Sequence, residues 1–364
     1  MRIHNFNPGP SALPLAAKER AQREMLDIDG TGISILEHSH RERTYEAIHR
    51  EAIALLRSYL QVPETHEIIF MQGGGRMQFA FVPLNMLKPG QSADYVITGA
   101  WAKQAYEEAQ RVSALIGASV RKAGSTEVDG RFNCIPRNEE LVLDPNAAYV
   151  HITTNNTIFG TQWHWLPETN APLVADASSD IGTRSMDWKR FGLVYAGAQK
   201  NLGPAGVTVV IARKDWMREG RSDIPQIFQY RAYAESESLL NTPPVFAIYM
   251  VRNTVQELLA WGGLSAIEKE SEEKARMIYD VIDSFPDFYR APVEKESRSR
   301  VNIVFRLPTE ELEKRFLSQA KERGFIGLKG HRSVGGIRAS LYAALRKESA
   351  EALADFMEKF AKGH

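Results

Sequence analysis

An acidic residue and a basic residue, Asp176 and Lys200, each follow a short apolar run in the middle of the sequence. The runs, 173–175 and 193–196, are short and flanked by Gly or Pro, which predicts buried strands of an α/β sheet. Ligands of such sheets bind at the carboxyl ends of the strands, which is where both residues stand. Ala, Gly, Leu and Pro surround Lys200, so burial is expected to lower its pKa and leave an amine that reacts with carbonyl groups.

These two residue types suit one cofactor, pyridoxal phosphate. Its aldehyde needs a lysine, for which Lys200 is the candidate, and its ring nitrogen needs a carboxylate, for which Asp176 is the candidate. The alternative is a surface lysine and an ordinary acidic residue at a strand end, and two residues alone do not decide between them. The other strand ends must therefore supply the rest of such a site.

A glycine-rich turn, residues 73–76, follows the strand expected at 67–71. Helical spacing resumes at Phe79, and a strand, a glycine turn and a helix start together form a phosphate cradle, because free backbone N–H groups meet the positive end of the helix dipole there. The turn lacks the spaced GxGxxG pattern of dinucleotide-binding proteins. A tight turn that needs positive φ is the structural alternative.

Two more strand ends carry candidate ligand-binding residues. Trp101 follows the strand expected at 94–97, where its indole is placed either to stack on a flat ring or to fill the core. The segment 154–157 follows the strand expected at 149–153, and its hydroxyls and amides suit a phenolic oxygen, a phosphate or the turn backbone.

Two His-Arg pairs, His40-Arg41 and His331-Arg332, concentrate positive charge in glycine- or serine-containing segments, and Arg338 follows the second pair. Each segment alone could be a solvated or salt-bridged loop. Together they favour a site for an anionic substrate, since charge-assisted hydrogen bonds from arginine bind phosphate and carboxylate strongly.

Composition excludes several other classes of protein. The 45 basic and 45 acidic residues balance, which argues against nucleic acid or an anionic membrane as partner. No apolar run is long enough to span a bilayer, and the first ten residues lack the apolar core of a signal peptide. A single cysteine, Cys134, allows no internal disulfide and favours the cytoplasm.

The 364 residues are long for a single hydrophobic core. We expect an extended segment over 1–15, a large domain over 16–260 and a small α+β domain over 261–364. In the large domain, a helix is expected to begin with Thr242 as its N-cap. In the small domain, helices are expected over 264–285, 309–323 and 349–362. Strands are expected at 207–212, 301–305 and 328–340, and 227–240 is expected to be irregular.

Seven motifs, spread over nearly the whole chain, resemble the phosphoserine aminotransferases, a dimeric family of the fold-type I, class V pyridoxal-phosphate enzymes. The motifs are HSHR (38–41), GGGR (73–76), DYVITGAW (94–101), VADASS (174–179), YAGAQKNLGPAG (195–206), NTPP (241–244) and KGHRSVGGIRAS (329–340). The resemblance implies an α/β fold whose large domain has a mostly parallel seven-stranded sheet between helices.

The resemblance also implies roles for individual residues. Lys200 and Asp176 would be catalytic, and the substrate would be bound by His40, Arg41, His331, Arg332 and Arg338. The cofactor-binding residues would be Gly75, Arg76, Trp101, Thr157, Asp176, Gln199, Lys200, Asn241 and Thr242. Asn241 and Thr242 would come from the second subunit of a homodimer, the two His-Arg pairs would meet across its interface, and no metal is implied.

The implied reaction is a ping-pong transfer of an amino group between L-glutamate and 3-phosphohydroxypyruvate, which gives O-phospho-L-serine and 2-oxoglutarate in serine biosynthesis. The related phosphorylated substrate of pyridoxine biosynthesis is a second candidate. One departure from the family pattern is visible: Asn7-Pro8 stands where many members carry serine, so any contact there must use the Asn7 amide, a carbonyl or neighbours.

Other readings remain open at this point. A small-substrate aminotransferase of class V would keep Lys200 and Asp176 but would not need two His-Arg pairs. A cysteine desulfurase would need a reactive thiol, and nothing around Cys134 marks it as one. A non-catalytic protein of the same fold could lose Lys200 or Asp176, whereas this chain has both.

Overall fold

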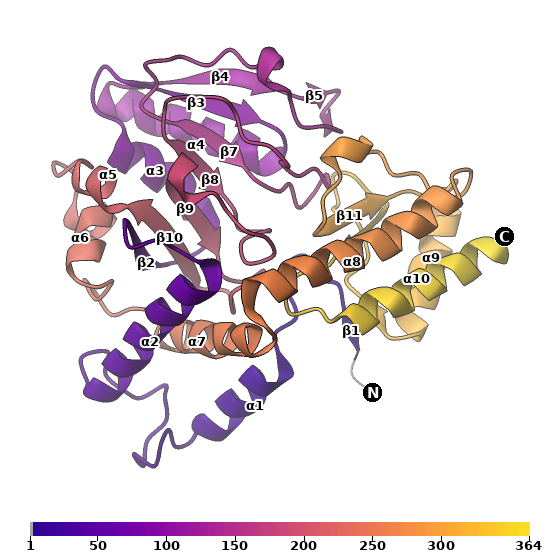
Figure 1. Ribbon diagram of the computed structural model, residues 1–364, viewed down its shortest axis with the longest axis horizontal. Coiled ribbons are helices and arrows are strands. Elements are labelled where there is room, and N and C mark those ends of the chain that lie inside the picture. The colour runs from indigo at the N-terminus through magenta and orange to yellow at the C-terminus, as the bar shows by residue number, and fades with distance from the viewer. Residues whose placement is uncertain (1–2) are drawn as a thin grey trace.

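A computed structural model describes residues 3–364 of the chain (Figure 1). Its centre is a seven-stranded sheet in the order β2-β10-β9-β8-β7-β3-β4. The neighbouring pairs from β9 to β4 are parallel, and only β10 pairs antiparallel with both its neighbours. The expected mostly parallel sheet is therefore confirmed. The strands are β2 (His66–Gln72), β10 (Val207–Arg213), β9 (Phe191–Gly197), β8 (Leu173–Asp176), β7 (Val150–Thr153), β3 (Ser92–Ile97) and β4 (Ser119–Ser125).

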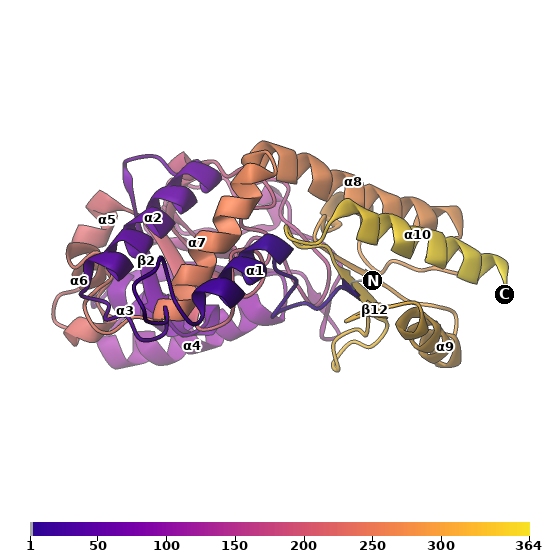
Figure 2. The ribbon, with the colours of Figure 1, turned by 90° about the horizontal axis from the view of Figure 1, so that it is seen from below.

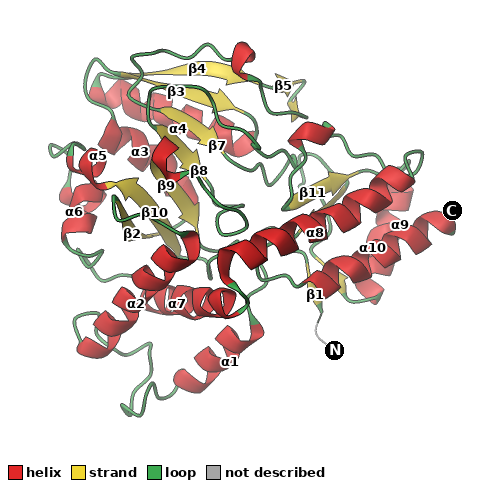
Figure 3. Cartoon of the chain, in the orientation of Figure 1, coloured by secondary structure: helices red, strands yellow, loops and turns green. Residues whose placement is uncertain are grey.

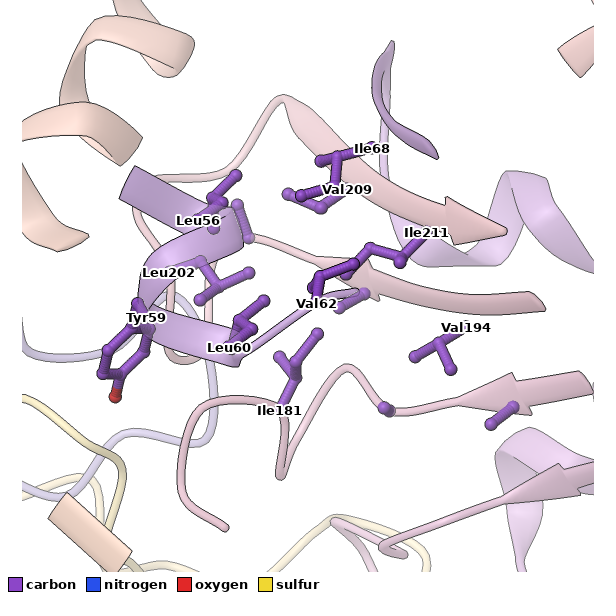
Figure 4. Packing of buried hydrophobic residues seen from close by; sticks show 14 of the residues in the cluster. Leu56, Tyr59, Leu60, Val62, Ile68, Ile181, Val194, Leu202, Val209 and Ile211 are labelled. Atoms are coloured by element: carbon purple, nitrogen blue, oxygen red, sulfur yellow. The ribbon is translucent and has the colours of Figure 1, made fainter. Parts of the chain in front are cut away.

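Helices cover both faces of this sheet, as the view from below shows (Figure 2). They are α2 (Arg43–Leu60), α3 (Gln78–Met86), α4 (Ala100–Ile116), α5 (Lys214–Arg218), α6 (Tyr230–Glu235) and α7 (Val245–Ala260). The helix α1 (Leu15–Glu24) packs on α7, and α8 (Gly263–Ser284) follows α7. Alternate residues of a strand serve opposite faces. Ile68 and Val209 share one cluster with Leu56 of α2 (Figure 4) and with residues of α7, whereas Ile69 and Val210 pack with α3, α4 and α6.

The chain after α7 builds a second hydrophobic cluster beside the sheet, on the right in Figure 3. Its elements are α8, β11 (Asn302–Phe305), α9 (Glu310–Glu322), β12 (Phe325–Ile326), β13 (Ile337–Ser340) and α10 (Lys347–Lys362). The N-terminal strand β1 (His4–Asn5) pairs in parallel with β12, and Phe6 packs into this cluster. Residues 1–2 of the expected N-terminal segment lie outside the described residues.

The remaining elements are short. A hairpin joins β5 (Glu127–Val128) to β6 (Arg131–Phe132). The single-turn 3-10 helices are η1 (Gly75–Met77), η2 (Asn138–Glu140), η3 (Trp188–Arg190), η4 (Gln226–Phe228) and η5 (Lys295–Ser297). Within residues 3–364, no helix combines the length and the apolar character needed to cross a lipid bilayer.

Three expected elements are wrong in part. Thr242 does not cap a helix: α7 begins at Val245 after Pro244, because Pro243 precedes another proline and so cannot adopt helical backbone angles easily. The strand expected over 328–340 is confined to 337–340, since Gly335 and Gly336 have φ of +74° and +70° and turn the chain just before it. The segment expected to be irregular, 227–240, contains α6.

Candidate active site

Three neighbouring strands deliver the central side chains to one edge of the sheet. Asp176 is the last residue of β8, Lys200 lies three residues after β9, and Thr157 lies four residues after β7. The Lys200 Nζ donates a hydrogen bond of 2.8 Å to the Thr157 Oγ1. The structure therefore brings together the amine and the hydroxyl that the sequence singled out.

The electrostatics around Lys200 favour a partly neutral amine. Burial lowers its pKa to about 8; the negative charge of Asp176 opposes this shift, and the positive charge of Arg338 adds to it. An ordinary exposed lysine has a pKa near 10.4, so near neutral pH a far larger fraction of this amine is unprotonated and nucleophilic.

Asp176 is buried, and burial raises its pKa, while Lys200 and the hydrogen bonds from Ser178 act in the opposite direction. The Ser178 backbone N–H donates to its Oδ1 at 3.0 Å. A buried carboxylate of this kind binds a protonated ring nitrogen favourably, because a nearby positive charge removes much of the cost of its burial.

The glycine turn after β2 lies against the same sheet edge. A Cβ atom on Gly75 would come within 2.9 Å of the Ser178 Oγ and 3.5 Å of the Gly197 backbone nitrogen. The Gly197 N–H donates to that same Ser178 hydroxyl at 3.1 Å. A side chain at this position would crowd the Ser178 hydroxyl, so glycine keeps the turn close to the sheet edge with its backbone N–H groups accessible to a phosphate, while the Arg76 side chain is exposed.

Trp101 lies in the first turn of α4 and is half-buried. It packs against Phe132, Ile158 and Phe159, so it is joined to the loop that carries Thr157. The Gly99 before it has no room for a Cβ, because the Asn156 Oδ1 would lie 2.1 Å away. That oxygen is buried without a hydrogen-bond partner. The sequence analysis missed this coupling between the Trp101 and Thr157 loops.

Arg338 reaches the site from β13, on the other hydrophobic cluster. It is buried, and its Nη1 donates to the Thr157 carbonyl oxygen at 3.3 Å. Its Nε is buried without a hydrogen-bond partner. A buried guanidinium with an unused donor beside a reactive amine is suited to a carboxylate.

The second His-Arg pair lies in the loop just before β13. His331 bonds to the Ser333 hydroxyl at 2.7 Å, and its pKa is lowered by burial and by the charges of Arg338 and Arg332. Arg332 itself is exposed. This loop therefore adds positive charge on the Arg338 side of the site.

The remaining sequence candidates are not joined to Lys200. No hydrogen bond or ion pair among residues 3–364 links it to His40, Arg41, Asn241 or Thr242. The loop with His40 and Arg41 connects α1 to α2 and projects at the lower left of Figure 1. The Asn241 Nδ2 donates to the Gln72 side chain at 3.2 Å, just before the glycine turn.

The N-terminal segment is the largest contribution that the sequence analysis missed. The Ser11 N–H donates to the Gln199 carbonyl at 3.0 Å, and the Ser11 hydroxyl donates to the Lys200 carbonyl. A Cβ on Gly9 would lie 3.2 Å from the Lys200 Cγ. The Gly9-Pro10 pair was the available signal, since a glycine–proline dipeptide marks a turn.

These residues fit pyridoxal phosphate. A partly buried amine of lowered pKa, a buried carboxylate, an indole and a hydroxyl converge with a turn at Gly75 that leaves little room for a side chain. Lys200 would bind the aldehyde, Asp176 the ring nitrogen and the 75–76 turn the phosphate. The burial of Cys134 raises the pKa of its thiol, which disfavours a reactive thiolate.

Comparisons with known proteins agree with this chemistry. The family model described as aminotransferase class-V matches residues 3–353. The chain is 49% identical over 364 residues to the phosphoserine aminotransferase of Halalkalibacterium halodurans, which covers 100% of this chain and 99% of that protein.

Solved structures are equally similar. Phosphoserine aminotransferase from Bacillus circulans subsp. alkalophilus has a TM-score of 0.94 and 49% identity, covering 100% of this chain and 99% of that one. A phosphoserine aminotransferase structure that describes radiation damage of its Schiff base has a TM-score of 0.95 and 47% identity, and both chains are covered completely.

Proposed function

The chain belongs to the class V aminotransferases and, within them, to the phosphoserine aminotransferase family, and from this premise we propose how its residues divide the reaction. It is an enzyme that uses pyridoxal phosphate to transfer an amino group between L-glutamate and 3-phosphohydroxypyruvate, forming O-phospho-L-serine and 2-oxoglutarate. The observation that carries the assignment of residues is the Lys200 amine, which has a pKa of about 8 and lies 2.8 Å from Thr157.

When bound, pyridoxal phosphate supplies an aldehyde for amino-group exchange and a protonated ring that withdraws electrons from the substrate. Lys200 would hold the aldehyde of the resting cofactor, and its neutral Nζ is suited to accept and carry a proton from the substrate α-carbon. Asp176 would hold the ring nitrogen, where its negative charge would favour the protonated form. Thr157 orients the Lys200 amine, and Gly75, Arg76 and Gln199 would hold the phosphate end.

Arg338 is proposed to bind the α-carboxylate of the substrate, because its buried Nε lacks a partner and its guanidinium lies beside Thr157. His331 and Arg332 would bind the distal phosphate of one substrate and the γ-carboxylate of glutamate. The two anions differ in charge and in acceptor atoms, so a site rich in arginine favours the phosphate.

We further propose that the site is completed in a homodimer. The loop that carries His40 and Arg41 is not joined to Lys200 within one chain, and it exposes the apolar side chains of Leu26, Ile33 and Leu36. Exposed apolar residues beside functional charges are typical of a subunit interface. His40 and Arg41, with Asn241 and Thr242, would then serve the site of the partner. A cytoplasmic location, expected from the single cysteine, is also a proposal.

The decisive experiment compares 3-phosphohydroxypyruvate with hydroxypyruvate as amino acceptor, with glutamate as donor and 2-oxoglutarate formation as readout. We expect kcat/KM at least about 100-fold higher for the phosphorylated acceptor, the effect of one to two charge-assisted hydrogen bonds. Equal values for the two acceptors would instead support a small-substrate aminotransferase of class V. Lys200→Ala serves as the inactive control.

A further inference from the structure

The hydroxyl group of Tyr342 joins the N-terminal segment to the reaction site. Tyr342 follows β13 and is only 1% exposed, and its hydroxyl donates to the Pro8 carbonyl at 2.7 Å. The Asn302 Nδ2 lies 3.4 Å from the same oxygen. We propose that Tyr342 is a positioning residue, which holds the segment 8–11 against Lys200; this rests on the proposed role of Lys200.

The segment that Tyr342 holds forms one wall around Lys200. Gly9, next to Pro8, lies so close that a Cβ would be 3.2 Å from the Lys200 Cγ. Ser11 donates hydrogen bonds to the carbonyls of both Gln199 and Lys200. A shift of Pro8 would therefore move the atoms that enclose the stem of the reactive lysine.

The backbone of Tyr342 is itself fixed from two sides. The buried Lys274 of α8 donates from Nζ to the carbonyls of Tyr342, at 3.1 Å, and Leu345, at 2.6 Å. The next N–H, of Ala343, donates to the Asn201 Oδ1 at 2.9 Å, and Asn201 follows Lys200 directly. Tyr342 is thus anchored both to the second cluster and to the lysine-bearing turn.

The phenol is held as a hydrogen-bond donor. Burial raises the pKa of Tyr342, and the hydrogen bonds with Asn302 and Thr157 offset this only in part. The phenol is therefore protonated near neutral pH, where it can donate to the Pro8 carbonyl. Pro8 has no N–H of its own, so its carbonyl is the only backbone hydrogen-bonding group this residue offers.

The test is Tyr342→Phe, which keeps the ring and removes one oxygen. Tyr289→Phe is a matched control, because Tyr289 is also 1% exposed and its hydroxyl donates to a backbone carbonyl, that of Met357, at 2.8 Å. Tyr289 lies in the second hydrophobic cluster, away from Lys200.

For Tyr342→Phe we expect kcat to fall about tenfold, the KM for 3-phosphohydroxypyruvate to stay within about twofold, and the acidic limb of the kcat profile to move to higher pH. In the cofactor-free protein, hydrogen exchange of the peptide that contains Ser11 should become about tenfold faster. Tyr289→Phe should change none of these quantities.

The proposal is overturned if exchange at Ser11 is unchanged in Tyr342→Phe, if kcat is unchanged, or if Tyr289→Phe has the same effects. Should Tyr342→Phe fail to fold, Gly9→Ala displaces the same segment directly at its contact with the Lys200 Cγ and must give the same loss of kcat and faster exchange. If the wild type had no aminotransferase activity, the proposed function would be contradicted but the contact between Tyr342 and Pro8 would not, because the hydrogen-exchange measurement does not require activity.

Discussion

The Nη1 atom of Arg338 lies 3.3 Å from the carbonyl oxygen of Thr157, the residue whose hydroxyl accepts a hydrogen bond from Lys200. One residue thus links a guanidinium from β13 with the amine that follows β9. The pKa of Lys200 is about 8, mainly because burial lowers it; the negative charge of Asp176 raises this pKa and the positive charge of Arg338 lowers it.

Removing the charge of Asp176 and removing the charge of Arg338 should therefore move the pKa of Lys200 in opposite directions. Asp176→Asn should lower it and Arg338→Gln should raise it, each by roughly one unit. The neutral amine forms as pH rises through the pKa. The acidic limb of Lys200 reactivity should therefore shift to lower pH in Asp176→Asn and to higher pH in Arg338→Gln. The measurement is the pH dependence of Lys200 acylation in the cofactor-free protein, read by peptide mass spectrometry.

Arg346→Gln is the control for this experiment, because Arg346 lowers the pKa of Lys274 rather than that of Lys200. It should leave the Lys200 profile unchanged. Shifts of the same sign in Asp176→Asn and Arg338→Gln would contradict the electrostatic description of the site.

Lys200 should be the residue that binds the cofactor covalently, although its pKa alone does not single it out. Lys274 is fully buried, whereas Lys200 is partly exposed, and the pKa of Lys274 is also lowered to about 8. Its Nζ, however, is occupied by the carbonyls of Tyr342 and Leu345. Borohydride reduction of the holoenzyme, which we expect to be yellow, should attach the cofactor permanently to the peptide that contains Lys200. Lys274→Met should give the same labelled peptide as the wild type. A cofactor label in Lys200→Ala would refute the assignment.

Local sequence patterns were sufficient for six of the seven sheet strands, all but β4, and for the central pair of residues, whereas the mostly parallel seven-stranded arrangement was implied by the family resemblance. The apolar runs that end at Asp176 and before Lys200 are strands β8 and β9, and neighbouring parallel strands necessarily bring their carboxyl ends to one edge. The glycine run at 73–75 also predicted the turn after β2. The division into domains at 15 and 260 remains a prediction.

Contacts between distant segments could not be read from local patterns. In the sequence, Tyr342 looks like an ordinary core residue. Only the folded chain shows that its hydroxyl donates a hydrogen bond to the Pro8 carbonyl. The same holds for the approach of Gly99 to Asn156, which depends on how two loops cross. The predicted start of α7 was wrong because the two prolines restrict the backbone, and this restriction outweighs the helix-capping preference of Thr242.

Arg332→Ala should discriminate between the two substrates. Loss of a charge-assisted hydrogen bond of about 1.5–3 kcal/mol should raise the KM for 3-phosphohydroxypyruvate roughly 10- to 100-fold, whereas the KM for glutamate should change less than about threefold. Steady-state kinetics with each substrate varied in turn gives the comparison. Arg290→Ala, at another exposed arginine, should change neither value, and equal losses for both substrates in Arg332→Ala would count against a phosphate role.

Complementation between inactive variants should reveal whether two chains share a site. Lys200→Ala lacks the reactive amine but keeps a functional Arg41, and Arg41→Ala has the reverse defect. If Arg41 acts in the site of the partner, a mixed dimer contains one site with both defects and one intact site. Mixing equal amounts, with subunit exchange in mild denaturant, should then restore about one quarter of wild-type activity, because half of the dimers are mixed. Sedimentation velocity must show the dimer, and a mixture that stays inactive although mixed dimers form would mean that Arg41 serves the site of its own chain.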